Sequence, residues 1–184
     1  KGTRANKLEM TDGKVTTVKA DFNGQEITYT ANKGVILATG GFGSNIEMRK
    51  QYNPKMDEKI LSTNSVGSTG DGIVMAEKVG ADLVDIDQIQ LHPTVEQKTS
   101  MLITESVRGD GAILVNQDGK RFTDELLTRD VVSAAELEQP GSYAYIIFDQ
   151  RLRDGLKAIE KYVSTGITVQ GDTIEELAEK IDVD

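Results

Sequence analysis

Apolar and polar residues alternate with the period of a β-strand in two segments near the N-terminus, residues 15–20 and 25–31. The turn signal Asn23-Gly24 separates them, so we expect a β-hairpin. A continuous apolar run follows at 34–39 and ends in Gly40-Gly41-Phe42-Gly43. This pattern is typical of a buried strand that runs into a tight turn.

Helical patterns follow both glycine-rich stretches of the first ninety residues. Ser44 and Glu47 have the spacing of a capping box, which predicts a helix that ends near Tyr52. The loop Gly70-Asp71-Gly72 leads into an amphipathic segment, 73–79, which is followed by a glycine suited to a C-cap. Each glycine-rich turn therefore precedes a helix N-terminus, an arrangement that suits nucleotide binding.

The rest of the chain is predicted as a small sheet with helices. Apolar runs predict four further strands, at 81–86, 101–104, 112–115 and 143–148. Helices are expected over 131–138, with Thr128 as its N-cap, over 150–162, and over 172–181, which Thr173 and Glu176 open as N-cap and capping partner. The expected core contains eight apolar side chains: Leu126, Val131, Leu137, Ile146, Phe148, Leu156, Ile174 and Leu177. The order of elements predicts an α+β fold.

The composition excludes several classes of site. The 184 residues include no cysteine, which rules out disulfides, thiolate metal ligands and a cysteine nucleophile within this chain. Because His92 is the one histidine, no metal site is expected. The net charge of −9 has the wrong sign for nucleic-acid binding.

The charge is divided unequally along the chain. Residues 1–90 contain 11 basic and 12 acidic residues, whereas 91–184 contain 10 and 18. We therefore expect two domains, 1–86 and 87–184. The chain begins without methionine and has neither a signal peptide nor an apolar stretch of membrane-spanning length, so we expect a fragment that does not insert into a membrane. The lack of cysteine is compatible with the bacterial cytoplasm or cell envelope, with the cytoplasm slightly favoured.

Neither glycine-rich turn identifies a ligand by itself. Counted from Gly41, the dinucleotide fingerprint G-x-G-x-x-G requires a third glycine where the chain has Ile46, so the fingerprint fails. Glycines that need a positive φ explain the turn at 40–43 as well as a phosphate or ribose contact does. The backbone N–H groups of Gly70-Asp71-Gly72 favour an anion, but this motif is weak.

Three polar features are candidates for chemistry. His92 titrates near neutral pH and can donate to a carboxylate, although a lone histidine is more often structural. The stretch 104–108 brings a hydroxyl, a carboxylate and a guanidinium together, which a surface ion pair also explains. Arg129 stands at a predicted helix N-terminus, where a cation needs a nearby anion. That anion is either its neighbour Asp130 or a substrate carboxylate.

Taken in order, these motifs resemble one family. The set consists of Val35 to Asn45, Thr69-Gly70-Asp71-Gly72, His92-Pro93-Thr94, Thr104 to Gly111, Gly119-Lys120-Arg121-Phe122 and Thr128-Arg129-Asp130. It is similar to the flavoprotein of the fumarate reductase and succinate dehydrogenase superfamily, and most of all to its soluble flavocytochrome c type fumarate reductases, which serve electron transport. The resemblance covers about residues 34–184.

The resemblance implies a Rossmann-like FAD domain and a capping domain, with the active site between them. Residues 1–86 would be part of the FAD domain and 87–184 a truncated capping domain. The implied FAD contacts lie on the two glycine-rich turns: Ala38, Thr39, Gly40, Gly41, Phe42, Gly70, Asp71 and Gly72. The glycine fingerprint for the FAD pyrophosphate and a second substrate histidine are missing, so we expect the isolated segment to lack bound FAD and activity.

The resemblance also implies roles in the reduction of fumarate to succinate. His92, Thr104 and Glu105 would bind a substrate carboxylate, and Arg129 would be the acid that protonates carbon after hydride transfer from the flavin. Glu105 and Arg108 would return a proton to Arg129. The electron donor is not implied. Two alternatives stay open: a related reductase of another enoate, such as urocanate, and a non-catalytic interaction domain.

Overall fold

The computed structural model describes residues 1–183, and close Cα approaches divide the chain into two compact units, residues 1–89 and the residues from Gln90 onward. The division lies three residues beyond the boundary expected from the charge pattern. Each unit is considered by itself. Within the described residues, no helix is long and apolar enough to cross a membrane.

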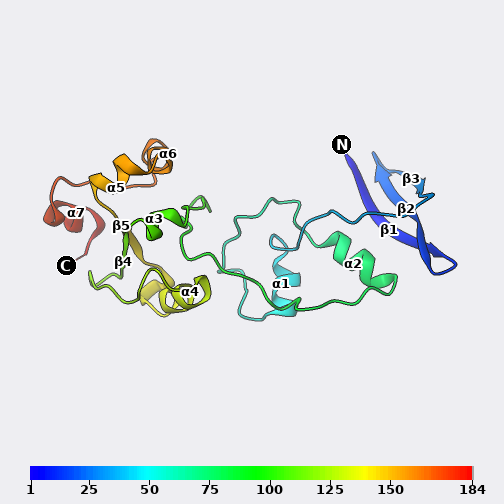
Figure 1. Ribbon diagram of the computed structural model, residues 1–184, viewed down its shortest axis with the longest axis horizontal. Coiled ribbons are helices and arrows are strands. Elements are labelled where there is room, and N and C mark those ends of the chain that lie inside the picture. The colour runs from blue at the N-terminus through cyan, green and yellow to red at the C-terminus, as the bar shows by residue number, and fades with distance from the viewer. Residues whose placement is uncertain (184) are drawn as a thin grey trace. The chain divides into compact units, whose positions relative to one another are not determined.

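The first unit opens with a three-stranded antiparallel sheet in the order β1-β2-β3 (Figure 1). The strands are β1 (Thr3–Thr11), β2 (Lys14–Phe22) and β3 (Gln25–Thr30). The predicted hairpin is confirmed: Asn23 and Gly24 both have positive φ, as a tight turn between right-twisted strands requires. Our patterns did not predict β1, because its apolar residues do not alternate with a clear period of two.

Two predicted strands of the first unit are absent. Residues 34–39 and 81–86 are extended or irregular, and Ile36 is 92% exposed. An apolar run forms a buried strand only when neighbouring strands satisfy its backbone groups. Among residues 1–183, no strand pairs with either segment. The strands predicted at 34–39 and 81–86 are therefore wrong.

Both predicted helices of the first unit are present as α1 (Ile46–Tyr52) and α2 (Asp71–Lys78). The N-cap of α1 is Asn45 and not Ser44, because the Asn45 side chain accepts from the backbone N–H of Met48 at 3.0 Å. The predicted capping box is therefore wrong. The Ser44 hydroxyl instead donates to the Ser65 carbonyl at 2.7 Å.

The second unit contains a two-stranded sheet and several short helices (Figure 1). The strands β4 (Ile113–Val115) and β5 (Tyr145–Ile147) pair antiparallel and confirm the predictions at 112–115 and 143–148. Residues 101–104 form only an isolated bridge, between Leu102 and Val95, so the strand predicted there is wrong. The helices are α3 (Ser106–Gly109), α4 (Arg129–Leu137), α5 (Gln150–Gly155), α6 (Ala158–Ser164) and α7 (Ile174–Ile181), with a 3-10 turn at Pro140–Ser142.

The helix predictions of the second unit succeed with one correction. The helices α4 and α7 begin after the expected N-caps, Thr128 and Thr173. The segment 150–162 forms two helices, because Leu156 between them is extended at φ −123° and ψ 95°.

The core of the second unit is built around Val107, Ala112, Ile159 and Tyr162. Among the eight residues predicted inside, Ile146, Phe148 and Leu156 pack against this cluster, and Leu177 is half-buried. The other four are exposed: Leu126, Val131, Leu137 and Ile174. On α4 the buried face carries Val132 and Ser133, so the helix is rotated relative to our assignment, and Val131 points outward.

Candidate functional site

The two glycine-rich loops predicted to hold the cofactor lie against each other in the first unit. The backbone N–H of Gly70 donates to the carbonyl of Gly41 at 3.1 Å. The Asn45 side chain, which caps α1, also donates to the Thr69 carbonyl at 2.9 Å. These bonds join segments more than twenty residues apart, so the structure brings the two predicted cofactor loops together.

Close packing explains the glycines at the start of α2. A Cβ on Gly72 would lie 1.9 Å from the Thr39 hydroxyl oxygen. Gly70 has φ +81°, and a Cβ there would lie 2.3 Å from the Met48 sulfur. Both positions therefore require glycine for the fold alone.

Gly41 is different, because the fold does not require a glycine there. A Cβ at Gly41 would meet nothing within 4 Å, and its φ is not in the left-handed region. The neighbouring predicted cofactor residues Ala38, Thr39 and Gly40 are exposed as well. A glycine that neither packing nor conformation demands fits a backbone that a ligand approaches closely. The residues present thus fit a nucleotide cofactor at this turn.

Asp71 lines a pocket of about 240 Å³ in the same unit. Its carboxylate accepts from the Thr69 hydroxyl and from the Arg4 guanidinium, each at 2.9 Å, and these bonds lower its pKa. The pocket is lined by Arg4, Ala5, Thr39, Gly67, Thr69, Asp71 and Met75. A carboxylate repels phosphate and accepts from hydroxyl groups, so the pocket suits a hydroxyl-bearing part of a nucleotide better than its pyrophosphate.

The predicted catalytic residues form a bridge in the second unit. The Glu105 carboxylate accepts from Arg129 through Nε at 3.0 Å and Nη2 at 2.8 Å, and from Arg108 Nη2 at 3.1 Å. One carboxylate therefore joins two guanidinium groups. Arg129 is paired with Glu105 rather than with Asp130. This pairing settles which neighbouring anion offsets the cation at the start of α4.

Different elements hold the three members of the bridge. Glu105 precedes α3, Arg108 lies within α3, and Arg129 is the first residue of α4. Arg108 is only 3% exposed, and its Nη1 donates to the Glu125 carbonyl, whereas Glu105 and Arg129 are partly exposed. Gln90 Oε1 accepts from Arg129 Nη1 at 2.7 Å. The outer arginine faces solvent, and the inner one is fixed in the protein.

The bridge remains fully charged at ordinary pH. Hydrogen bonding to Arg129 lowers the pKa of Glu105 to about 2, against a smaller opposite effect of desolvation. The same bond raises the pKa of Arg129. Glu105 is therefore a carboxylate throughout the pH range in which enzymes work.

The charges of the bridge residues act on the pKa of His92. Burial lowers its pKa, and the charge of Arg129 lowers it further, so the ring is neutral near pH 7. The backbone N–H of Thr94 donates to Nδ1 at 3.3 Å. With Nδ1 as an acceptor, the ring proton is on Nε2, which leaves a donor suited to a substrate carboxylate.

Thr104 is held close to the histidine segment. The backbone N–H of Ile103 donates to the Thr94 carbonyl at 3.0 Å, and the Thr94 hydroxyl donates to the Ile103 carbonyl at 2.8 Å. The N–H of Thr104 donates to the Tyr162 hydroxyl at 2.8 Å. The five predicted substrate and catalytic residues thus belong to one region of the second unit, although their roles remain predictions.

Sequence reasoning missed three supporting residues of this region. Gln90 lies two residues before His92, and Glu125 lies four after Arg121, a spacing that favours an ion pair. Tyr162 is 58 residues from Thr104 and carried no signal in the sequence. Pairings over such distances become visible only in the folded chain.

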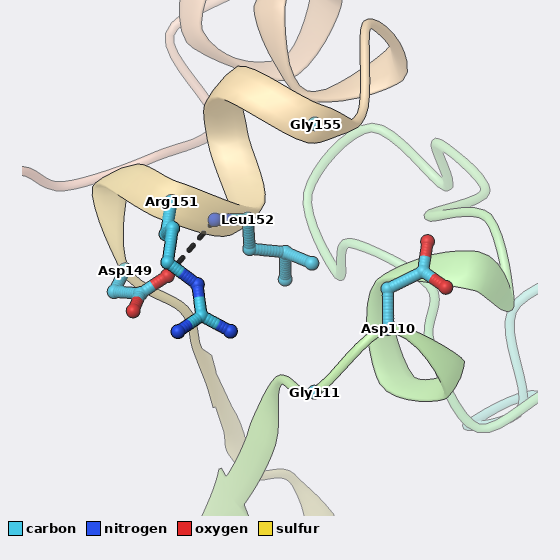
Figure 2. Close-up of a pocket in the computed structure, with 6 residues that line it drawn as sticks. All are labelled: Asp110, Gly111, Asp149, Arg151, Leu152 and Gly155. Carbon is cyan, nitrogen blue, oxygen red and sulfur yellow. Dashed lines mark hydrogen bonds between the residues drawn. The ribbon is translucent and has the colours of Figure 1, made fainter.

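A separate surface hollow of about 350 Å³ contains none of the predicted site residues (Figure 2). It is lined by Asp110, Gly111, Asp149, Arg151, Leu152 and Gly155. The Asp149 carboxylate caps α5 by accepting from the Leu152 N–H at 2.9 Å. The Asp149 carboxylate thus serves the helix, so the bridge region is the better candidate site.

Comparisons with known proteins agree with this picture. The chain matches the FAD binding domain family over residues 1–184. It is 44% identical over 99% of its length to an NADH:fumarate oxidoreductase of Klebsiella pneumoniae, and 42% identical over its whole length to a urocanate reductase of Eggerthella lenta. A solved open conformation of a flavocytochrome c3 fumarate reductase matches 99% of the chain at 42% identity, with a TM-score of 0.80. The chain spans 20% of the first of these proteins and 32% of each of the others.

Proposed function

This chain belongs to the FAD binding domain family, and we propose that the protein carrying it reduces the carbon–carbon double bond of an unsaturated carboxylate, with fumarate as the substrate. The family membership and the similarity to a flavocytochrome fumarate reductase agree with the predicted α+β fold and with FAD as the cofactor. The reaction and its substrate are our proposal.

One observation carries the proposal: the Glu105 carboxylate bridges a buried and an exposed arginine. A simple surface ion pair needs only one arginine. A carboxylate between two guanidinium groups can take a proton from Arg108 and pass it to Arg129 after Arg129 has given its own to the substrate, and solvent supplies the proton that Arg108 gives up; repeated protonation of a substrate requires such a relay. The exposed position of Arg129 also leaves it accessible to a substrate.

FAD, when bound and reduced by the protein's electron donor, would supply the hydride for one alkene carbon. His92 Nε2 and Thr104 would bind and orient one substrate carboxylate. Arg129 would give its proton to the second carbon, and its charge would stabilise the negative charge that develops there. An arginine is a very weak acid, with a pKa above about 12 in water, but a carbanion is basic enough to take its proton. Glu105 and Arg108 would then restore that proton.

The exposed turn of the first unit would hold the cofactor. Ala38 to Phe42 would contact the nucleotide through their main chain, and Gly41 would allow the closest approach. Asp71 would accept from a hydroxyl group of the cofactor while Arg4 keeps it charged.

The test is steady-state reduction by the full-length protein with a reduced dye as the electron donor. We expect flavin absorbance in the purified protein and a kcat/KM for fumarate well above that for urocanate. Similarity to a urocanate reductase makes urocanate the second candidate, and the opposite ranking would select it. Failure to reduce either compound would refute the proposal and favour a non-catalytic role.

A further inference from the structure

Glu125 contacts one arginine of the bridge, Arg108, and lies four residues before the other, Arg129. Its backbone carbonyl accepts from Arg108 Nη1, and four residues later Arg129 begins α4. Its side chain is buried, since Glu125 is only 3% exposed. Buried carboxylates are uncommon in proteins unless they are paired, so this residue requires an explanation.

The Glu125 carboxylate ties its own turn to the sheet. It accepts from the backbone N–H of Leu114 in β4 at 2.8 Å, and from Arg121 Nε at 3.0 Å and 3.1 Å. Burial raises its pKa, but the bonds from Arg121 and Leu114 more than offset this, so the pKa is lowered overall. The tie is therefore ionic and lasts through the working pH range.

Hydrogen bonds within the short turn 124–127, which contains Glu125, determine its shape. Asp124 accepts from the N–H groups of Leu126 at 2.9 Å and Leu127 at 3.2 Å. These bonds set the shape of the turn but do not fix it against β4. The buried Glu125 carboxylate provides that connection. Its loss would shift the turn, and with it both the Glu125 carbonyl that binds Arg108 and the start of α4.

We propose that Glu125, with Arg121 as its partner, is a positioning residue for proton delivery: it fixes the turn 124–127 to β4 and so keeps Arg108 and Arg129 within hydrogen-bond distance of Glu105. The inference rests on the proposed function, because the spacing of the bridge matters to activity only if Arg129 protonates the substrate. Glu125 itself acts through the two arginines and touches no substrate.

Two single variants of the full-length, flavin-loaded protein test this inference. Glu125→Gln keeps an acceptor for the Leu114 N–H but removes the charge that pairs with Arg121. Arg121→Met removes the exposed partner and leaves Glu125 in place. We expect each to lower kcat for fumarate by about 10- to 100-fold, since small displacements of reacting groups have effects of this size. The double variant should be no slower than Glu125→Gln, because both changes break the same tie.

The accompanying readouts separate positioning from loss of structure. We expect the FAD content, the KM and the affinity for succinate to change less than about threefold. The solvent deuterium isotope effect on kcat should increase, because proton transfer becomes slower relative to the other steps. The control is Glu160→Gln, which breaks the exposed pair with Arg153 elsewhere in the same unit and should leave kcat unchanged.

The outcomes are decisive in each case. A normal kcat in Arg121→Met, a strictly additive double variant, or an equal loss in Glu160→Gln would overturn the inference. If Glu125→Gln does not fold, Arg121→Met decides alone, because the Arg121 side chain is 57% exposed and the Glu125 carboxyl that remains still accepts from the Leu114 N–H. A wild-type protein that reduces no enoate would refute the proposed function and this inference with it, whereas an active wild type with unchanged variants refutes the inference alone.

Discussion

The two units bring their predicted site residues together by different means. In the first unit, main-chain hydrogen bonds and glycines join the two loops, as between Gly70 and Gly41. In the second, side chains make the connections, and Glu105 alone binds two arginines. A site made of backbone depends on space and conformation, and a site made of side chains depends on particular functional groups. Substitutions should therefore separate cofactor binding from chemistry.

The largest effect is expected from Arg129→Ala in the full-length protein. The substitution removes the proposed proton donor, so kcat for fumarate should fall by a factor of about 10² or more. Arg129→Lys should recover little, because an ammonium group cannot reproduce the planar pairing with Glu105. The measurement is kcat with a reduced dye, together with the FAD content.

The FAD content should stay normal in both Arg129 variants, since the predicted cofactor contacts lie in the first unit. Arg153→Ala is a suitable control, because Arg153 forms a similar pair with Glu160. A near-normal kcat for Arg129→Ala would eliminate the proposed mechanism. Loss of FAD in the same variant would show that the two sites are not separable.

Two glycine substitutions test the backbone site of the first unit. In Gly72→Ala the new methyl group would collide with Thr39, so we expect the free energy of unfolding to fall by about 1–3 kcal/mol. Gly41→Ala has open space, so stability should be unchanged, while FAD affinity should fall about tenfold if the nucleotide approaches this backbone. Urea unfolding and FAD titration of the full-length apoprotein measure both. Normal FAD affinity in Gly41→Ala would argue against a cofactor contact at this turn.

Local signals predicted much of each unit. Asn23-Gly24 predicted the hairpin, and Thr173 with Glu176 predicted the start of α7, because turn and capping chemistry act within a few residues. The exposed run 34–39 could not be predicted, since a strand exists only where partner strands exist. The predicted buried face of α4 was wrong for a similar reason. Several faces of this helix carry apolar residues, and tertiary packing buries the face that contains Val132.

The sequence predicted the residues of the candidate site but not the hydrogen bonds and ion pairs that join them. Residue types and their order indicated His92, Glu105 and Arg129 through a family resemblance. The sequence left two anions open for Arg129, and only the folded chain pairs it with Glu105, 24 residues away. Glu125 has a suggestive i, i+4 spacing to Arg121, but its bond to Arg108 goes through a backbone carbonyl, which leaves no trace in the sequence.

A smaller effect on a different kinetic constant is expected from His92→Ala. A neutral histidine that donates to a carboxylate contributes to the ground state and the transition state alike, so KM for fumarate should rise about tenfold while kcat changes little. The pH dependence of KM should remain flat between pH 7 and 8, because burial and Arg129 lower the pKa of His92. A large fall in kcat with an unchanged KM would assign His92 to proton transfer.

The last effect concerns stability rather than kinetics, and it distinguishes the second unit from the first. Burial raises the pKa of Glu136 on α4 to about 7, and the charge of Arg108 opposes this only in part. Between pH 4.5 and 7 Glu136 thus binds its proton more firmly in the folded chain than in the unfolded chain, so the contribution of this carboxyl to stability is greatest below about pH 4.5 and is lost as the pH rises to 7. Glu136→Gln should remove this decline and stabilise the second unit at pH 8 by roughly 1–3 kcal/mol. Hydrogen exchange of amides in α4 and β4 measures the effect, with Glu138→Gln at the exposed C-cap of the same helix as the control. Equal pH slopes in wild type and Glu136→Gln would show that this carboxyl is solvated in the folded chain, and amides of β1–β3 should show no difference in any variant.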